Sequence, residues 1–475
     1  MWNEWVTDFK VEVDGEAELI CPIEEETPCK GEVMFLSNLD QVVLYPIETV
    51  YFYPLHNNVP TSTEVVPHKL KEALRRLLVP YDFMAGRLHL NRHLFRLELL
   101  CNNAGVLFAA AYADVNLADV GDVTFPNPGF ASLVLQVRHA TSLAQLPLTT
   151  VQVTRFKCGG FTIGFSSNHV LVDGIAAGEF LANYASMVRG EGMRLLPKVD
   201  RTMLKARSPP IVEFEHHEYV WLPGEPFSQQ LDPMLSYTEI DALAAATSQG
   251  HALVDYAYKA FHVDGKLLAK LKKEGMGCLP DGVIDGRRTC TSFEALAAHL
   301  WQCRTKAMGM DHLEYSTFLF AVDLRHLINP PLPSGFAGNA VLSACARASV
   351  DELLSKPLSY VVQKVQEARA RVTDRYVRSA IDCLEKNKGV PLTSSGYYVS
   401  AWTKVLQHQC LDFGWGPPIH VGPVVSALVD FVLFLSDGST SDGLFVLVAM
   451  PPNHLSKFHS LFLHLGPNDT FFPHV

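Results

Sequence analysis

A connector at residues 196–226 constrains most strongly how this chain can fold. Its sequence, LPKVDRTMLKARSPPIVEFEHHEYVWLPGEP, is rich in Pro and charged residues and follows neither the period of a strand nor that of a helix. The 475-residue chain also exceeds the length at which a single hydrophobic core keeps growing. We therefore expect two domains of similar size, at 1–195 and 227–475, joined by an extended crossover loop.

Both parts alternate predicted strands and helices, without low-complexity tracts or short repeats. A strand at 151–157, a Gly-containing turn and a return strand at 161–166 precede a helix that begins beyond Asp173-Gly174. The pattern also predicts helices at 67–79, 265–273 and 293–307, a hairpin formed by 427–435 and 444–450, and a short helix near Pro452. The expected fold class is therefore α/β, built in two layers.

The charge balance and the cysteine pattern narrow the class of protein. Asp and Glu number 50 against 39 Lys and Arg, and the net charge of −11 argues against general nucleic-acid binding, which needs cations for the phosphates. The ten Cys are scattered without a CxxC pair, as is typical of a reducing compartment. The longest apolar run, 427–435, contains Asp430 and is too short to span a membrane, and the N-terminus lacks a signal-peptide pattern. We therefore expect a soluble cytoplasmic protein.

A histidine at the end of the predicted return strand is the candidate catalytic residue. Residues 169–174 read HVLVDG, which places His169 at a sheet edge before a Gly-containing turn. An imidazole titrates near neutrality and can remove a proton from a hydroxyl or amine that attacks a carbonyl. Asp173 can orient the ring through Nδ1 or cap the following helix. Taken alone, the pattern still favours an ordinary structural histidine, because the chain contains 19 His and short motifs match by chance.

The other short motifs give no site. His216-His217-Glu218 suggests a metal, but the segment lies in the connector without a fitting third ligand, and HExxH is absent. GFSSN at 164–168 lacks the last Gly of the serine-hydrolase pattern GxSxG. Neither a P-loop nor a dinucleotide fingerprint occurs. We therefore expect no metal and no permanently bound cofactor.

A second motif, DFGWG at 412–416, changes the interpretation of His169. With HVLVDG and DFGWG together, the chain resembles the BAHD family of plant CoA-dependent acyltransferases, for which HxxxDG and DFGWG in this order are defining motifs. Similar segments run along the whole length: LSNLD at 36–40, MAGRL at 84–88, DRTMLKARSPP at 200–210, TSFEALAAHLWQCRTKA at 291–307 and VDLRHLINPPLPSGFAGNAV at 322–341. The chain departs from the family pattern at Pro417, where Lys is common, and in FAGN at 336–339, where YFGN is usual.

The resemblance implies a fold and a mechanism. The fold would comprise two similarly sized α/β domains of the chloramphenicol acetyltransferase-like type, with His169 in a solvent channel at their interface. Acyl-CoA would enter from one side and the acceptor from the other. His169 would deprotonate the acceptor, which attacks the thioester, and the tetrahedral intermediate would expel CoA thiolate. The resemblance further implies a monomer that uses acyl-CoA as substrate.

The resemblance also implies roles for individual residues. Asp173 would point away from the substrates and pair with an arginine, for which Arg325 is the candidate. Other motif residues would be architectural: Gly174, Asp412, Gly414, Trp415 and Gly416. Polar and basic groups at a helix start would bind CoA, unless they form a solvated loop: Arg287, Arg288, Thr291 and Ser292, with Lys404 as a further cation. Trp402 and Ser37 would lie on the acceptor side, with core packing as the alternative for Trp402.

Within the family, three stretches look most like the branch that uses hydroxycinnamoyl-CoA: LSNLDQVVLYPIETVYFY, DRTMLKARSPP and VTRFKCGGFTIGFSSNH. We therefore expect transfer of a feruloyl, coumaroyl or caffeoyl group to a long-chain fatty alcohol or ω-hydroxy fatty acid. A shikimate or quinate hydroxycinnamoyltransferase is the alternative. The rivals from other classes are a non-catalytic partner in very-long-chain lipid elongation and a hydrolase that transfers the acyl group to water.

Overall fold

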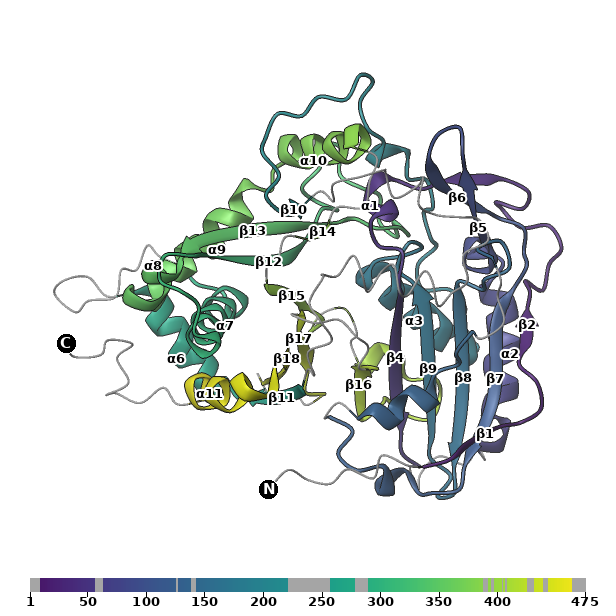
Figure 1. Cartoon of the computed structure of the whole chain (residues 1–475). Helices are drawn as coiled ribbons and strands as arrows, with labels where there is room; N and C mark the ends of the chain where they lie inside the picture. The colour runs from purple at the N-terminus through teal and green to yellow at the C-terminus, as the bar shows by residue number, and fades with distance from the viewer. Residues whose placement is uncertain are drawn as a thin grey trace.

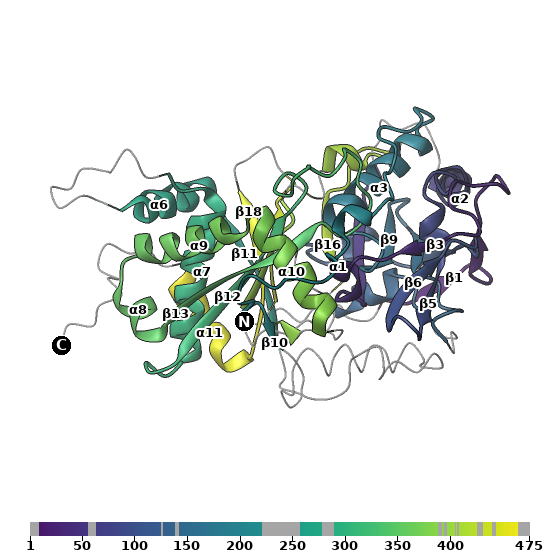
Figure 2. The same ribbon diagram turned by 90° about the horizontal axis from the view of Figure 1, so that it is seen from above.

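Two large sheets form the frame of the computed structural model (Figure 1). It describes residues 9–55, 63–124, 127–137, 142–220, 257–277, 289–387, 392–393, 397–403, 405, 408–424, 431–438 and 443–463. Seen from above, the two sheets with their helices lie side by side as two halves (Figure 2). Each half combines a sheet with helices that cover one of its faces, so the predicted α/β fold class is confirmed.

The N-terminal half is built on a sheet in the order β1-β7-β8-β9-β4-β16, with β2 also paired to β7. Its strands are β1 (Val11–Val13), β2 (Glu18–Ile20), β4 (Pro46–Tyr53), β7 (Val106–Ala113), β8 (Thr149–Phe156), β9 (Phe161–Asn168) and β16 (His420–Pro423). The β7–β8 pair is parallel and the other pairs are antiparallel. Helices α2 (Val66–Leu77) and α3 (Gly174–Val188) pack on one face of this sheet and enclose its main core.

The C-terminal half is built on a sheet in the order β11-β18-β17-β15-β12-β13. Its strands are β11 (Ala257–Val263), β12 (Tyr315–Asp323), β13 (Val341–Ser349), β15 (Tyr397–Ala401), β17 (Phe431–Ser436) and β18 (Leu444–Met450). Helices α6 (Gly265–Met276), α7 (Ser292–Met308), α9 (Leu358–Arg371) and α11 (Pro452–Leu463) cover one face (Figure 1). Side chains of strand β17 alternate between the two faces of the sheet. Val432 and Phe434 join the helix-covered core, while Leu433 and Leu435 face the other way.

Apart from α10, the remaining elements are short. Two small sheets consist of β3 (Val33–Phe35), β6 (Arg96–Leu100) and β5 (Arg87–Asn91), and of β10 (Tyr219–Val220) with β14 (Leu392–Thr393). The other α-helices of the described residues are α1 (Asn38–Gln41), α8 (Val350–Ser355) and α10 (Asp374–Asn387). Short 3₁₀ helices are η1 (Thr63–Val65), η2 (Asp82–Ala85), η3 (Leu117–Val120), η4 (Pro128–Leu133), η5 (Thr202–Leu204) and η6 (His408–Leu411). Within the described ranges, no helix is both long and apolar enough to cross a membrane.

Local sequence accounts for the elements that frame the site. Helix α2 has Pro67 in its first turn, where the missing N–H costs nothing, and Leu70, Leu74 and Leu77 form its buried stripe. Strands β8 and β9 form the predicted antiparallel pair. The predicted hairpin is also present as β17 and β18; residues 427–430 of the predicted range lie outside the described residues.

One segment from the C-terminal part of the sequence belongs to the N-terminal half. Strand β16 pairs with β4 at the edge of the N-terminal sheet, as Figure 1 shows for the yellow-green strand beside the purple one. Leu411, Phe413 and Trp415, just before β16, join the core beneath α2 and α3. The DFGWG motif, which falls in the predicted C-terminal domain, therefore packs in the N-terminal half.

Burial of a neutral histidine in α7 should make the fold sensitive to acid. His299 lies under α11, where its Nε2 donates to the Phe462 carbonyl at 3.0 Å, and burial lowers its pKa from 6.5 to about 4. Between these values the unfolded chain binds a proton that the folded chain does not, so stability is lost as pH falls through this window, by about 1.4 kcal/mol per pH unit. In chemical denaturation at pH 7, 6 and 5, His299→Gln should flatten this slope, because its amide cannot titrate.

The exposed His217 provides the matched control, since its side chain is 60% exposed. A His217→Gln variant should keep the pH slope of the wild-type protein. A His299→Gln variant that also keeps it would show that His299 does not contribute to the acid sensitivity.

Candidate active site

His169 follows the last residue of β9, where the strand leaves the N-terminal sheet. All eight residues of β9 are buried, and the His169 N–H donates to the Tyr45 carbonyl at 2.8 Å, which extends the pairing with β4 by one residue. The Tyr45 ring meets the imidazole edge-on, with the ring centroids 5.5 Å apart. The imidazole itself is half-buried. The strand therefore fixes the backbone of His169, and its ring extends from the end of the sheet.

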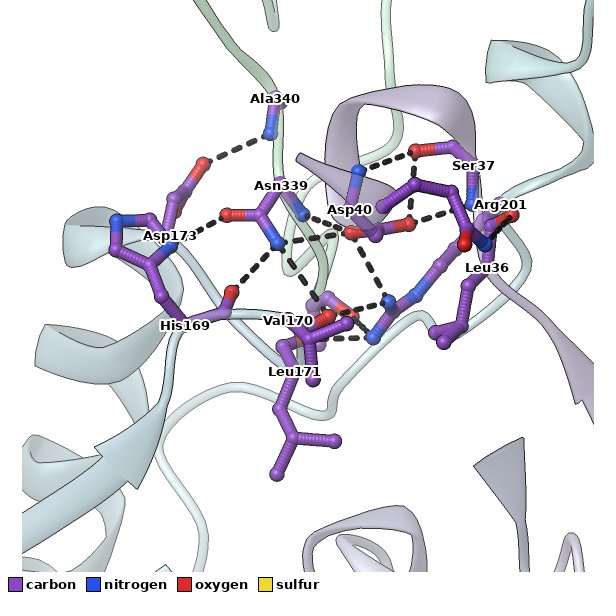
Figure 3. A network of polar contacts seen from close by, with 12 residues as sticks. Leu36, Ser37, Asp40, His169, Val170, Leu171, Asp173, Arg201, Asn339 and Ala340 are labelled. Atoms are coloured by element: carbon purple, nitrogen blue, oxygen red, sulfur yellow. Dashed lines mark hydrogen bonds and ion pairs between the residues drawn. The ribbon is translucent and has the colours of Figure 1, made fainter. Parts of the chain in front are cut away.

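The side chain of Asn339 holds the imidazole from the opposite half of the molecule. Asn339 lies between β12 and β13, and its Oδ1 is 2.9 Å from His169 Nδ1 (Figure 3). Its Nδ2 donates to the His169 carbonyl at 2.7 Å and to Asp40 Oδ1 at 2.8 Å. His169 and its hydrogen-bond partner thus come from the two halves, which places the ring where the halves meet.

These contacts fix which ring nitrogen carries the proton. A flipped Asn339 amide would bring its oxygen against a carboxylate and a carbonyl, so Nδ2 must face Asp40 and Oδ1 must face the ring. An amide oxygen only accepts, so His169 Nδ1 must be the donor. In the neutral imidazole Nε2 then carries the lone pair, and no described residue makes a hydrogen bond to it. The arrangement suits a general base.

Asp40 lies behind Asn339 in a fully buried ion pair. Asp40 Oδ1 is 3.0 Å from Nη1 of Arg201, and neither side chain is exposed. Asp40 Oδ2 accepts from the Ser37 backbone N–H at 2.6 Å and from the Ser37 hydroxyl at 2.7 Å. Arg201, which belongs to the connector, also donates to the Val170 and Leu171 carbonyls. The loop after His169 is therefore tied to the connector and to α1 (Figure 3).

Asp173 makes no hydrogen bond to His169 and has a different set of partners. Its Oδ1 accepts from the Ala176 N–H at 2.9 Å and so caps α3. The Arg325 guanidinium spans both carboxylate oxygens with two contacts of 2.9 Å, and the Ala340 N–H donates to Oδ2 at 2.9 Å. The ion pair with Arg325 is the one that the resemblance implied. Asp173 therefore joins the two halves and starts α3.

The DFGWG segment has the geometry of a tight turn. Gly414 and Gly416 have φ of 99° and 92°, which side chains other than glycine rarely adopt, and both N–H groups donate to Asp412 Oδ1, at 2.7 and 2.9 Å. Phe413 meets Tyr53 and Tyr184 edge-on in the core. Trp415 is buried against Phe161. The described contacts of the DFGWG residues therefore stabilise the turn and the core of the N-terminal half.

The residues expected to bind substrates have varied surroundings. The side chain of Ser37 is fully buried and forms a capping box with Asp40 at the start of α1, so its hydroxyl is engaged within the protein. Thr291 caps α7 in the same way with Glu294, and Ser292 is the first residue of that helix. Trp402 is half-buried against clusters from both halves, and its indole N–H is 3.2 Å from Ser400 Oγ. Arg287, Arg288 and Lys404 lie outside the described residues.

The His216-His217-Glu218 segment forms a structural contact of the connector. His216 lies between Glu218 Oε1 at 2.8 Å and Ser379 Oγ at 2.9 Å, and these three side chains are buried against α10. Across the described ranges, no group of three or more His, Cys, Asp and Glu residues is placed to hold a metal ion.

Sequence reasoning missed Asn339, which holds the imidazole, and the ion pair behind it, Asp40 and Arg201. Each lies in a segment that carries the family resemblance, namely FAGN, LSNLD and DRTML. One local signal was available, because Ser37 and Asp40 have the spacing of a capping box, which predicts that both side chains are engaged at a helix start.

Comparisons with known proteins extend over nearly the whole chain. A model described as the Transferase family matches residues 9–465. Acyltransferase GLAUCE of Arabidopsis thaliana is 36% identical over 462 residues, with 96% of each chain covered. Omega-hydroxypalmitate O-feruloyl transferase of the same plant is 35% identical over 97% of this chain and 94% of its own. Fatty alcohol:caffeoyl-CoA acyltransferase, also of A. thaliana, is 31% identical over 92% and 94%.

Solved structures share the fold at low sequence identity. The crystal structure of vinorine synthase has a TM-score of 0.69 with 19% identity, over 94% of this chain and 96% of its own. TRI101 of F. sporotrichioides, complexed with coenzyme A and T-2, has a TM-score of 0.66 with 16% identity, over 89% and 96%. Both likenesses concern the arrangement of the whole chain.

Proposed function

Because the chain belongs to the BAHD acyltransferases of the Transferase family, we propose that it moves a hydroxycinnamoyl group from CoA to the hydroxyl of a long-chain alcohol or ω-hydroxy fatty acid. His169 is the general base of this reaction. The observation that carries the assignment is the orientation of the imidazole, with Nδ1 committed to Asn339 and the Nε2 lone pair left for a substrate proton.

In the proposed reaction the acceptor hydroxyl gives its proton to His169 Nε2 while its oxygen attacks the thioester carbonyl carbon. The tetrahedral intermediate then breaks its carbon–sulfur bond, which releases the ester and CoA thiolate, and the imidazolium returns its proton to the thiolate. Both substrates are present together, so no acyl-enzyme forms. The neutral Nδ1–H tautomer suits this sequence, because the Nδ1 hydrogen bond to Asn339 persists when Nε2 is protonated.

Relatives support the choice of substrates. Two of the similar proteins are named for a feruloyl or caffeoyl donor and for a fatty alcohol or ω-hydroxypalmitate acceptor. The segments of this chain that resemble the hydroxycinnamoyl-using branch include β4 and β9, the two strands that hold His169. We therefore assign a feruloyl, coumaroyl or caffeoyl donor and a long-chain primary alcohol acceptor to this chain.

A thiol-release assay tests this proposal. Feruloyl-CoA or p-coumaroyl-CoA, mixed with a long-chain primary alcohol or ω-hydroxypalmitate, should release CoA at a rate that depends on the acceptor. Shikimate and quinate in place of the lipid should give slower release, and so should acetyl-CoA or malonyl-CoA in place of the aromatic donor. One wrong contact in a pocket changes selectivity by about 1–3 kcal/mol, or roughly 10- to 200-fold, which such an assay resolves.

The control reactions separate the rival functions. CoA release that continues without any acceptor would identify a hydrolase. Faster turnover with shikimate or quinate would overturn the acceptor, and faster turnover with acetyl-CoA would overturn the donor. A folded protein without turnover on any pair would favour the non-catalytic partner.

A further inference from the structure

We propose that Asp40 is a positioning residue, which acts on His169 through the side chain of Asn339. This inference rests on the proposed role of His169 as base and extends it by two residues. Asp40 would orient the Asn339 amide, keep the imidazole in the Nδ1–H tautomer and stabilise the positive charge that the ring acquires. The Asp40 carboxylate, the amide and the ring form one continuous line of hydrogen bonds (Figure 3).

The contacts of Asp40 define it as an acceptor on every side. Oδ1 faces Asn339 Nδ2 at 2.8 Å, the Asn339 backbone N–H at 3.2 Å and Nη1 of Arg201 at 3.0 Å. Oδ2 faces the backbone N–H and the hydroxyl of Ser37. With a donor at each contact, the carboxylate has no acceptor to which a proton of its own could bond, and this favours its ionised form. A charged carboxylate therefore stands behind the amide.

The orientation of the Asn339 amide allows the Asp40 charge to act on the ring. Asn339 Nδ2 points at Asp40 and Oδ1 points at His169, so the negative end of the amide dipole faces Nδ1–H. A neighbouring anion polarises a hydrogen-bonded amide and strengthens the next bond in the chain. When Nε2 accepts a proton, the ring becomes a stronger donor to the same oxygen. The line Asp40–Asn339–His169 therefore stabilises the protonated imidazole more than the neutral one.

Other charged groups around the ring moderate the effect. Arg201 pairs with Asp40 and offsets part of its charge, while its Nη1 and Nη2 groups also donate to the carbonyls of residues 170, 171 and 337. Asp173 is paired with Arg325, which also contacts the Asp323 carboxylate at 3.0 Å. Tyr45 presents a ring edge, and burial raises the pKa of its phenol far above neutral pH. Asp40 is the anion that reaches the imidazole through a single intervening side chain.

Two substitutions interrupt the line at different points. Asp40→Asn removes the charge with little change in shape, and Asn339→Ala removes the connecting amide while Asp40, Arg201 and Ser37 keep their mutual contacts. We expect both variants to lower kcat/KM by about 10-fold, the lower end of the loss seen when outer partners of metal-bound imidazoles are removed. Both should also shift the acid limb of the pH profile of kcat/KM to lower pH, because a less stabilised imidazolium forms only in more acidic solution.

Asp382 provides the matched control. It is another buried aspartate that holds the connector, through Arg207 Nε at 2.6 Å and the Ile211 N–H at 2.8 Å, and it contacts neither Asn339 nor His169. Asp382→Asn should lower the melting temperature but leave the acid limb where the wild-type protein has it. A loss of stability alone is thereby separated from a change at the imidazole.

An NMR titration of the ¹⁵N-labelled His169 ring needs no substrate and keeps the two proposals distinguishable. The wild-type ring should show the Nδ1–H tautomer, and its titration midpoint should fall in Asp40→Asn and in Asn339→Ala. If Asp40→Asn does not fold, an Asn339→Ala midpoint equal to the wild-type value still overturns the proposal, because Asp40 reaches the ring through that amide. A wild-type ring in the Nε2–H tautomer, or midpoints that coincide with the wild-type value, would overturn the role of Asp40. A wild-type ring that titrates as expected in a protein without acyl-transfer activity would contradict the proposed function and leave the role of Asp40 intact.

Discussion

Replacement of His169 by alanine should lower kcat/KM for acyl transfer by about 10²–10⁴-fold, the contribution usual for a positioned general base. The loss should appear mainly in kcat, since the imidazole acts on the acceptor proton during attack. Nε2 is the nitrogen that the Asn339 contact leaves available for the acceptor proton, and alanine provides no group in its place. The measurement is CoA release from the hydroxycinnamoyl donor at saturating acceptor.

The His217→Ala variant controls for the removal of an imidazole as such, because that side chain is exposed in the connector and distant in sequence from the motif. It should retain the activity of the wild-type protein. The melting temperature of His169→Ala should stay close to that of the wild-type protein, because a half-buried side chain with one hydrogen bond contributes about 1 kcal/mol. Full activity in a folded His169→Ala protein would mean that another group removes the proton.

Replacement of Asp173 by alanine should lower the free energy of unfolding by about 3–5 kcal/mol, the range for removal of one partner of a buried ion pair. The variant loses the α3 cap and leaves Arg325, whose side chain is only 11% exposed, with Asp323 as its remaining carboxylate. Denaturant unfolding measures the loss. At temperatures where the variant is folded, kcat/KM should fall less than in His169→Ala, because Asp173 does not touch the imidazole.

A double variant tests whether the buried Arg325 charge causes this loss. Adding Arg325→Leu to Asp173→Ala should restore part of the stability, since the cation that has lost its Asp173 partner is removed as well. A loss below about 1 kcal/mol for Asp173→Ala would show that the pair behaves like an exposed ion pair and does not hold the halves together.

Local sequence patterns were sufficient to predict the secondary-structure elements around the site. The apolar stripe of α2, the Gly turn between β8 and β9 and the cap at Asp173 each depend on neighbours in sequence, so their residues alone predicted them. The identity of the group that holds the imidazole could not be predicted this way. HVLVDG suggests Asp173, whereas the ring faces Asn339, because α3 and Arg325 already occupy the aspartate.

The network behind Asn339 depends on distant parts of the chain. Asp40, Arg201 and Asn339 lie on three separate segments, and only packing of both halves brings them to one place. The same limit applies to β16, whose pairing with β4 is set by the arrangement of whole halves. The contact between Ser37 and Asp40 differs, because the spacing of a capping box is local and can be read from the sequence.

The return of residues 408–424 to the N-terminal sheet affects how the protein is made in the cell. Strand β4 leaves the ribosome early, but β16, the strand that covers its edge, is synthesised only after β15. Until then the nascent chain carries an open strand edge, to which other polypeptides can add. A chain truncated before β16 would keep this edge permanently, so premature termination should yield insoluble aggregates rather than a smaller working protein.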